Sequence, residues 1–156
     1  MSATGPARKS KVLIVDDEQV QLSLLTQALE KTGEYVTQPT RSPTEALEMA
    51  MAEEPDAVIT DISMPDMSGI ELTRKLRAEY PTLPIIVITG LAGDESARAA
   101  YDAGATDFTT KPIEPRNIVV RLGRALAKVP EQEILLRAVR AAYAPTGILG
   151  SDPRIV

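Results

Sequence analysis

Several residues that can carry chemistry stand at the ends of short apolar runs. They are Asp16, Asp17 and Glu18 after one run, Asp61 after another, Thr89 at the end of a third, and Lys111 after a fourth. Clustered carboxylates raise one another's pKa values unless a cation offsets them, and Mg²⁺ takes such oxygen ligands. An aspartate in such a site can act as the nucleophile toward a phosphoryl group, whose charge an amine and a hydroxyl help to neutralise. These residue types favour phosphoryl-transfer chemistry.

Each of these features also has an ordinary structural explanation. An Asp-Asp pair after a strand is common in turns and helix caps, and Asp61 is followed by residues typical of a polar loop. Thr89 alone is compatible with a simple strand-end hydroxyl, and Lys111–Pro112 alone carries little information. The functional interpretation rests on their joint occurrence, in order, at four of the five predicted strand ends.

The apolar runs alternate with stretches of helical period, which predicts βαβ units and a parallel sheet. The predicted strands are Lys11–Val15, Tyr35–Thr40, Ala57–Thr60, Ile85–Thr89 and Thr106–Thr109. The first, third and fourth are almost wholly apolar, as expected of strands covered on both faces. The second and fifth are more polar and are expected nearer the edges. Ligands bind at the carboxyl ends of such strands, so the polar residues above should share one edge.

The predicted helices carry their own start and stop signals. The first contains Leu22, Leu25, Ala28 and Leu29 and stops at Gly33. The second begins in the capping box Ser42–Glu45, in which Glu45 is expected to reach back to the Ser42 N–H, and stops before Pro55. The third begins in the capping box Ser68–Glu71 and stops before Pro81, the fourth runs from Asp94 to Ala103 before Gly104, and the fifth opens at Pro115 and continues to Val129. The expected fold is an α/β, (βα)₅ doubly wound, five-stranded parallel sheet.

The composition excludes several classes of function. The chain has 156 residues, no cysteine and no histidine, which removes disulfides, thiol nucleophiles, zinc clusters and a histidine phosphodonor on this chain. A net charge of −5 disfavours a fold-wide nucleic-acid surface. Apolar runs such as Val12–Val15 are too short to span a membrane, and no signal-peptide pattern follows the first basic residues. We therefore expect a soluble, cytoplasmic protein without direct nucleic-acid or membrane binding.

Four segments resemble the four motifs of response-regulator receiver domains. They are Val12–Glu18, Pro55–Gly69, Pro84–Gly90 and Gly104–Pro112, and the spacing of Asp61, Thr89 and Lys111 is also similar to that family's. The resemblance covers about residues 9–129. It implies a flavodoxin-like receiver domain over 9–129 that takes a phosphoryl group from a sensor histidine kinase. Such a domain is a phosphoacceptor rather than an enzyme acting on other molecules.

The resemblance also implies roles for individual residues. Asp61 would be the phosphoacceptor, and Asp16 and Asp17 would hold Mg²⁺ together with Asp61 and the backbone carbonyl of Ser63. Thr89 would donate a hydrogen bond to the phosphoryl group, and Lys111 would pair with it. Phe108 would be the rotating switch aromatic. The Lys111–Pro112 bond would be cis. Plain core packing is the alternative explanation for Phe108. Gly90 replaces a residue that is often alanine in the family, which would loosen the loop after Thr89.

The pattern changes after Pro130. Residues 130–143 predict a short amphipathic linker helix, which the five βα units do not need. Residues 144–156 form a tail whose last part, Gly147–Val156, resembles the opening of the AAA+ ATPase domain of sigma-54-dependent transcription activators. A disordered tail is the plain alternative. No G-x-x-x-x-G-K-[ST] loop occurs, so this chain does not hydrolyse ATP by that means.

Two alternatives for the output, and one for the class of protein, follow from the sequence. The chain is expected to be the receiver end of an activator of that kind, or else a stand-alone receiver that signals only by protein–protein contact. An aspartate-nucleophile phosphatase is disfavoured, because such enzymes commonly carry a second acid where this chain has Ser63. A homodimer is expected through the fourth helix, fifth strand, fifth helix and linker helix. The mixed charges of that face would suit ion pairs across a two-fold axis.

Overall fold

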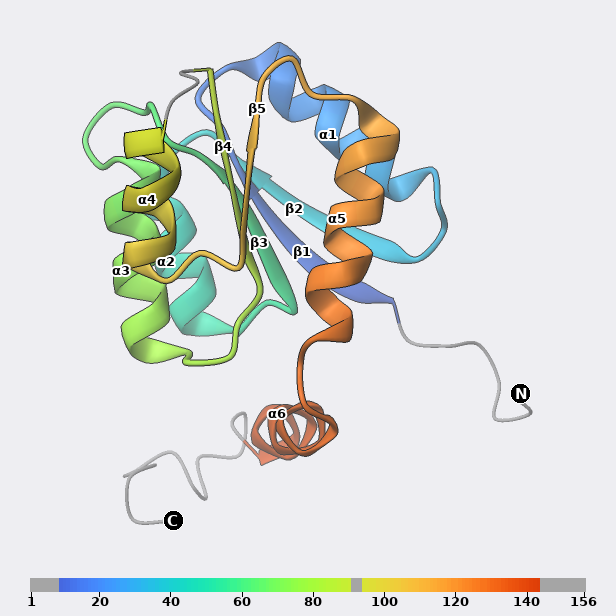
Figure 1. The fold of residues 1–156 in the computed structure, drawn as a ribbon. Coiled ribbons are helices and arrows are strands. Elements are labelled where there is room, and N and C mark those ends of the chain that lie inside the picture. Colours follow the sequence, from blue (N-terminus) through green and yellow to red (C-terminus); the bar gives the residue numbers. More distant parts are fainter. Residues whose placement is uncertain (1–8, 91–93, 144–156) are drawn as a thin grey trace.

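A computed structural model describes residues 9–90 and 94–143 (Figure 1). The predicted tail at 144–156 lies outside the described residues. Five strands form one sheet: β1 (Ser10–Val15), β2 (Tyr35–Thr40), β3 (Ala57–Asp61), β4 (Ile85–Thr89) and β5 (Asp107–Thr110). Their order is β2-β1-β3-β4-β5, and every pair is parallel. The predicted doubly wound fold is confirmed, with the two more polar strands at the edges.

Helices cover both faces of the sheet. They are α1 (Gln19–Glu30), α2 (Pro43–Ala52), α3 (Gly69–Glu79), α4 (Asp94–Ala103) and α5 (Pro115–Ala127). Helices α1 and α5 lie on one face and α2, α3 and α4 on the other (Figure 1). The fifth helix stops at Ala127, so Val129, which the sequence placed on it, lies beyond its end.

The alternation of side chains along each strand divides the core into two layers. The layer under α1 and α5 takes Val12, Ile14, Ile59, Ile86 and Ile88 from the strands. The layer under the other three helices takes Leu13, Val15, Val58, Ile85 and Val87. All ten of these side chains are buried. The continuous apolar runs of the central strands are therefore explained by burial on both faces.

Local signals position the helices largely as the sequence predicts. The hydroxyls of Ser42 and Ser68 accept hydrogen bonds from the backbone N–H groups of Glu45 and Glu71, both at 3.1 Å. The predicted hydrogen bond from the Ser42 N–H back to the Glu45 side chain is wrong, however. The Glu45 carboxylate accepts from the hydroxyl of Thr40, and the Ser42 N–H donates to that same hydroxyl at 3.2 Å. Thr40, at the end of β2, thus takes the place of Glu45 as the partner of the Ser42 N–H.

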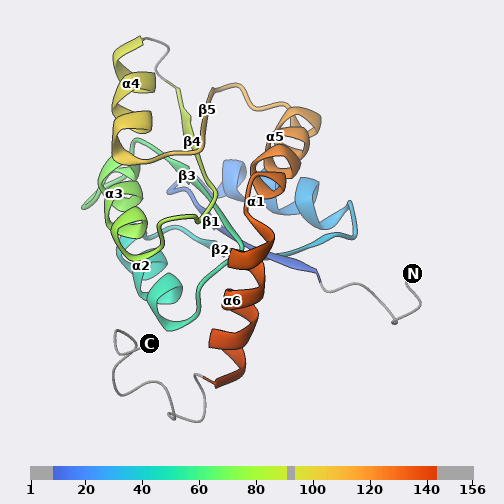
Figure 2. The same cartoon turned by 60° about the horizontal axis from the view of Figure 1, so that its bottom comes forward.

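Helix α6 (Glu131–Tyr143) confirms the predicted helix after Pro130. It lies below the sheet, at the end where the strands begin (Figure 2). The Arg140 guanidinium contacts Glu54 at 3.4 Å and Glu133 at 2.9 Å. Four large apolar side chains of this helix are exposed: Ile134, Leu135, Leu136 and Val139. Among the helices the structure describes, none is long and apolar enough to cross a membrane.

Candidate functional site

The sheet brings the sequence-predicted residues to one edge. Asp16 directly follows β1, Asp61 ends β3 and Thr89 ends β4. These strands are neighbours, because β3 pairs with both β1 and β4. The three residues are almost completely buried, with exposures of 1%, 3% and 0%. Two carboxylates and a hydroxyl thus lie at the carboxyl ends of three adjacent central strands.

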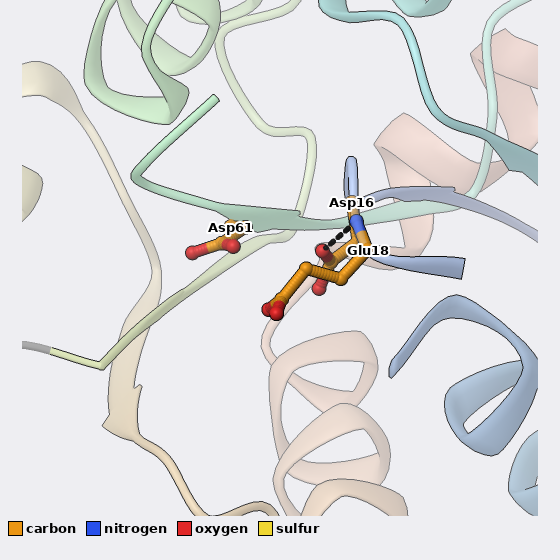
Figure 3. Close-up of side chains that lie close together, drawn as sticks. All are labelled: Asp16, Glu18 and Asp61. Carbon is orange, nitrogen blue, oxygen red and sulfur yellow. Dashed lines mark hydrogen bonds between the residues drawn. The ribbon is translucent and has the colours of Figure 1, made fainter. Parts of the chain in front are cut away.

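Asp16, Glu18 and Asp61 form an acidic group (Figure 3). Each offers a carboxylate oxygen, and these oxygens lie within 4.8 Å of one another. The Glu18 backbone N–H donates to Asp16 Oδ1 at 2.9 Å, which fixes the chain as it leaves β1. The motif resemblance assigned no role to Glu18. Its position directly after Asp16 and Asp17 could have indicated that it belongs to the site.

Lys111 supplies the positive charge of the site. Its Nζ lies 3.1 Å from Asp61 Oδ2 and 2.9 Å from Glu18 Oε1. Its backbone N–H donates to the Thr89 carbonyl at 2.8 Å, joining the ends of β5 and β4. The Lys111–Pro112 peptide bond is cis, as the resemblance implied. The residues predicted at three strand ends therefore converge around Asp61.

The site has more negative charge than Lys111 can neutralise. Burial raises the pKa of Asp16 to about 6, and the nearby charges of Asp61 and Glu18 act in the same direction, against the Glu18 N–H bond and Lys111. Burial opposes the charge on Lys111, but its hydrogen bonds to Glu18 and Asp61 outweigh this and raise its pKa. The hydrogen bond to Lys111 lowers the pKa of Glu18.

The loop after β3 places the backbone close to Asp61. The Gly69 N–H donates to the Ile62 carbonyl at 2.8 Å. A Cβ atom at Gly69 would lie 1.9 Å from the Asp61 carbonyl oxygen, so only glycine fits there. The Ser63 N–H lies 3.4 Å from Asp61 Oδ1. The start of α3 therefore packs directly against the backbone at Asp61.

The remaining predicted residues lie around this centre. Asp17 is partly exposed and is not a member of the acidic group; its carbonyl accepts a hydrogen bond from Arg41 Nε at 3.0 Å. Phe108 is half-buried and packs against the core layer under α2, α3 and α4. Gly90 is exposed, and a Cβ there would be 3.8 Å from Lys111 Cδ, so alanine would fit.

The donor chemistry of the site suits a hard divalent cation. Three carboxylates gather around one ammonium, which leaves an excess of negative charge. Oxygen ligands of this kind, partly open to water, are what Mg²⁺ takes in phosphoryl-transfer sites. The residues present therefore fit the metal that the resemblance implied.

Comparison with known proteins defines the class. The family model described as "Response regulator receiver domain" matches residues 12–123, and the chain belongs to this family. A receiver domain protein (CheY-like) from Methanospirillum hungatei superimposes with a TM-score of 0.75 at 31% identity, covering 81% of this chain and 99% of that one. CheY4 of Vibrio cholerae gives a TM-score of 0.72 at 29% identity, covering 76% and 99%.

Two curated relatives are longer proteins. The probable transcriptional regulatory protein TcrX of Mycobacterium tuberculosis is 38% identical over 117 residues, which are 75% of this chain and 49% of TcrX. The DNA-binding transcriptional regulator NtrC of Proteus hauseri is 29% identical over 146 residues, 94% of this chain and 31% of NtrC. The chain thus spans half or less of these relatives. Receiver domains are signalling domains, and response regulators are phosphorylated by histidine kinases.

Proposed function

We propose that this chain receives a phosphoryl group on Asp61 from a sensor histidine kinase in the cytoplasm, with Mg²⁺, and thereby changes conformation to control transcription. The observation that carries the proposal is the contact between the buried Asp61 carboxylate and Lys111, within the acidic group. A buried carboxylate paired with one ammonium is held in position, as a nucleophile requires.

The proposed chemical step uses the residues gathered around Asp61. An oxygen of Asp61 attacks the phosphorus of the donor's phosphohistidine, and an O–P bond forms. The P–N bond breaks, and its electron pair leaves with the imidazole. Lys111, beside Asp61, pairs with a phosphoryl oxygen, and the Thr89 hydroxyl donates to another. Catalysis consists of positioning and charge neutralisation, which dominate phosphoryl transfer in general.

Mg²⁺ would be held by Asp16, Asp17 and Asp61 with the backbone carbonyl of Ser63. When bound, it supplies further neutralisation of the phosphoryl oxygens. The burial of Asp16 and Asp61 supports their part in this ligand set, because buried carboxylates without enough counter-charge gain most from a cation. Asp17 and Ser63 are included in the proposed ligand set because of the resemblance and because they lie next to Asp16 and two residues after Asp61 in the sequence.

Conformational change is assigned to Thr89 and Phe108. Thr89, drawn toward the phosphoryl oxygens, would vacate space that Phe108 can enter from its half-buried position. The phosphorylated state would be favoured by the contacts that only it makes. The Phe108 ring then links the site to the surface formed by α4, β5 and α5.

For the output, we propose a receiver domain at 9–129, a helical linker at 130–143 and a tail at 144–156 that begins the ATPase domain of a sigma-54-dependent activator. The alignment with NtrC supports this, because its 146 residues extend past the receiver domain into the C-terminal segment. A stand-alone receiver would instead require that the natural reading frame stop near Val156, which the downstream DNA sequence decides.

The phosphoacceptor is tested by incubating the chain with acetyl phosphate and Mg²⁺ and measuring its intact mass. We expect one phosphoryl adduct on the wild type and none on Asp61→Asn. The matched control is Asp66→Asn, an exposed aspartate on the same loop whose positive φ asparagine tolerates. Asp66→Asn should be labelled normally. An undiminished adduct on Asp61→Asn would refute the assignment.

The metal ligands are tested by titrating Mg²⁺ into the unphosphorylated chain and following backbone amide signals by NMR. Asp17→Ala should weaken binding by about tenfold or more, because water replaces the ligand but not its charge. Asp102→Ala, which removes an exposed carboxylate from α4, should bind Mg²⁺ as the wild type does. Equal affinity in Asp17→Ala and Asp102→Ala would exclude Asp17 as a ligand.

A further inference from the structure

Glu18 and Asp61 share one ammonium. The Lys111 Nζ lies closer to Glu18 Oε1, at 2.9 Å, than to Asp61 Oδ2, at 3.1 Å. Asp61 is 3% exposed, whereas the Glu18 side chain is 64% exposed. The buried Asp61 carboxylate therefore shares the Lys111 ammonium with the exposed carboxylate of Glu18.

The backbone of Glu18 is well fixed. Glu18 is the N-cap residue of α1, its N–H donates to Asp16 Oδ1 at 2.9 Å, and its carbonyl accepts from Leu22 at 3.0 Å. The side chain extends from this anchored position toward Asp61 (Figure 3). The strand end and helix start thus hold the carboxylate within reach of Lys111, although the side chain itself is exposed.

We propose that Glu18 is a positioning residue that competes with Asp61, and with the phosphoryl group on it, for Lys111. The proposal rests on the proposed phosphoacceptor role of Asp61. In the unphosphorylated chain, Glu18 holds the ammonium partly away from the acceptor. When a phosphoryl group arrives, Lys111 can neutralise it fully only by giving up the Glu18 contact.

This competition has a measurable direction. Glu18→Gln keeps the length of the side chain but removes the charge that binds Lys111. Phosphorylation of Asp61 by acetyl phosphate should then become about threefold to tenfold faster, a change in keeping with one charge pair near a protein surface. The control is Glu48→Gln, an identical change of charge at an exposed position on α2, which should label at the wild-type rate.

A second pair of variants separates competition for Lys111 from simple repulsion of an anionic donor. If Glu18 acts through Lys111, Glu18→Gln has no effect on the labelling rate in a Lys111→Ala background. If its charge merely repels the donor, the same acceleration persists without Lys111. Labelling of both Lys111→Ala chains is followed by intact mass over extended times.

A readout independent of phosphorylation is the NMR signal of the Lys111 ammonium, assigned by its loss in Lys111→Ala. Glu18→Gln should shift this signal and speed its exchange with water, whereas Glu48→Gln should not. Unchanged labelling and an unchanged signal in Glu18→Gln would overturn the proposal, as would acceleration that survives Lys111→Ala. If even the wild type is not labelled, the proposed function fails, while the ammonium signal still decides whether Glu18 binds Lys111.

Discussion

Asp16 shows what a buried carboxylate does to the stability of the metal-free protein. Its pKa rises from 3.8 to about 6 in the fold. The folded state therefore binds a proton that the unfolded state has already lost, so stability falls as the pH rises through this window. Below about pH 4 the penalty is absent, and above pH 6 it is fully present.

Asp16→Asn should remove this penalty while its amide oxygen still accepts the Glu18 N–H. Without Mg²⁺ and above pH 6, we expect the free energy of unfolding of the variant to exceed that of the wild type by about 2–3 kcal/mol, with a higher urea midpoint. Near pH 4 the two proteins should be equally stable. Urea titrations at several pH values measure the difference. A difference that stays constant from pH 4 to pH 7 would show that the Asp16 charge is not its cause.

Residue types and strand register together predicted most of the site. The end of each apolar run locates Asp16, Asp61 and Thr89 to within a residue, because strand register fixes their neighbours. Register does not determine where a long side chain points. Glu18, the last of three consecutive acids, reaches Lys111 through its rotamer, and that choice depends on a lysine far along the chain. The contact could be read only from the fold.

At the scale of elements, the start of α3 is fixed against the end of β3 through Gly69. Gly69→Ala would force a methyl group against the Asp61 carbonyl oxygen, displacing either the helix or the acceptor strand. We expect a loss of at least about 2 kcal/mol in stability, together with slower labelling of Asp61. Thermal denaturation and intact mass measure the two effects.

The control for this change is Gly123→Ala on α5, where a Cβ meets nothing within 4 Å. Alanine should stabilise that helix by about 0.5–1 kcal/mol, because glycine loses more backbone entropy on folding. If both variants lose stability alike, steric contact with Asp61 does not explain the glycine at position 69.

Arg77 joins α3 to the end of α4. Its Nε and Nη2 donate to the Gly104 carbonyl at 2.9 and 2.7 Å, and its Nη1 donates to the Tyr80 carbonyl at 2.9 Å. Arg77→Met should remove both side-chain donors from the Gly104 carbonyl and leave the Tyr80 carbonyl only the Leu83 N–H at 3.3 Å, which should destabilise the fold by about 1–3 kcal/mol. Arg74→Met, at an exposed position of the same helix, should change stability little. Urea titration compares them, and equal losses would contradict the role.

The elements were predictable where the cause is local. Serine caps, proline starts and glycine stops act within a few residues, and Gly33 and Gly104 indeed adopt positive φ values of 77° and 109°. The partner of Glu45 was mispredicted because Thr40, at the end of the preceding strand, lies within reach of its carboxylate. The contacts between Arg77 and Gly104 join segments far apart in sequence, so no local sequence pattern predicts them.

For the whole molecule, a homodimer through α4, β5, α5 and α6 stays a prediction. Asp107 and Arg121, two charged residues of that face, already pair within the chain at 2.9 Å. The exposed apolar side chains of α6 therefore become the stronger part of the expected interface. A helix of 13 residues is marginal alone and gains most from packing against a partner.

Sedimentation velocity should show a dimer of the full chain, strengthened by beryllofluoride as a phosphoryl mimic. A version ending at Lys128 should dimerise more weakly, because it lacks α6. A monomer under all conditions would exclude the dimer, and an equally stable dimer after truncation would show that α6 has no part in it.

The backbone hydrogen bond from Lys111 to the Thr89 carbonyl bears on how the proposed response to phosphorylation would spread through the molecule. Both residues that would contact the phosphoryl group belong to the β4 and β5 side of the sheet, and this bond extends the pairing of the two strands up to the site. The opposite flank, where β2 pairs with β1, meets the site at Asp16, whose N–H donates to the Thr40 carbonyl at 3.2 Å, and not at a residue that would contact the phosphoryl group. If Asp61 is phosphorylated as proposed, the β4 and β5 flank would respond through its own contacts with the phosphoryl group, whereas the β2 flank would be reached only through the residues proposed to hold the metal.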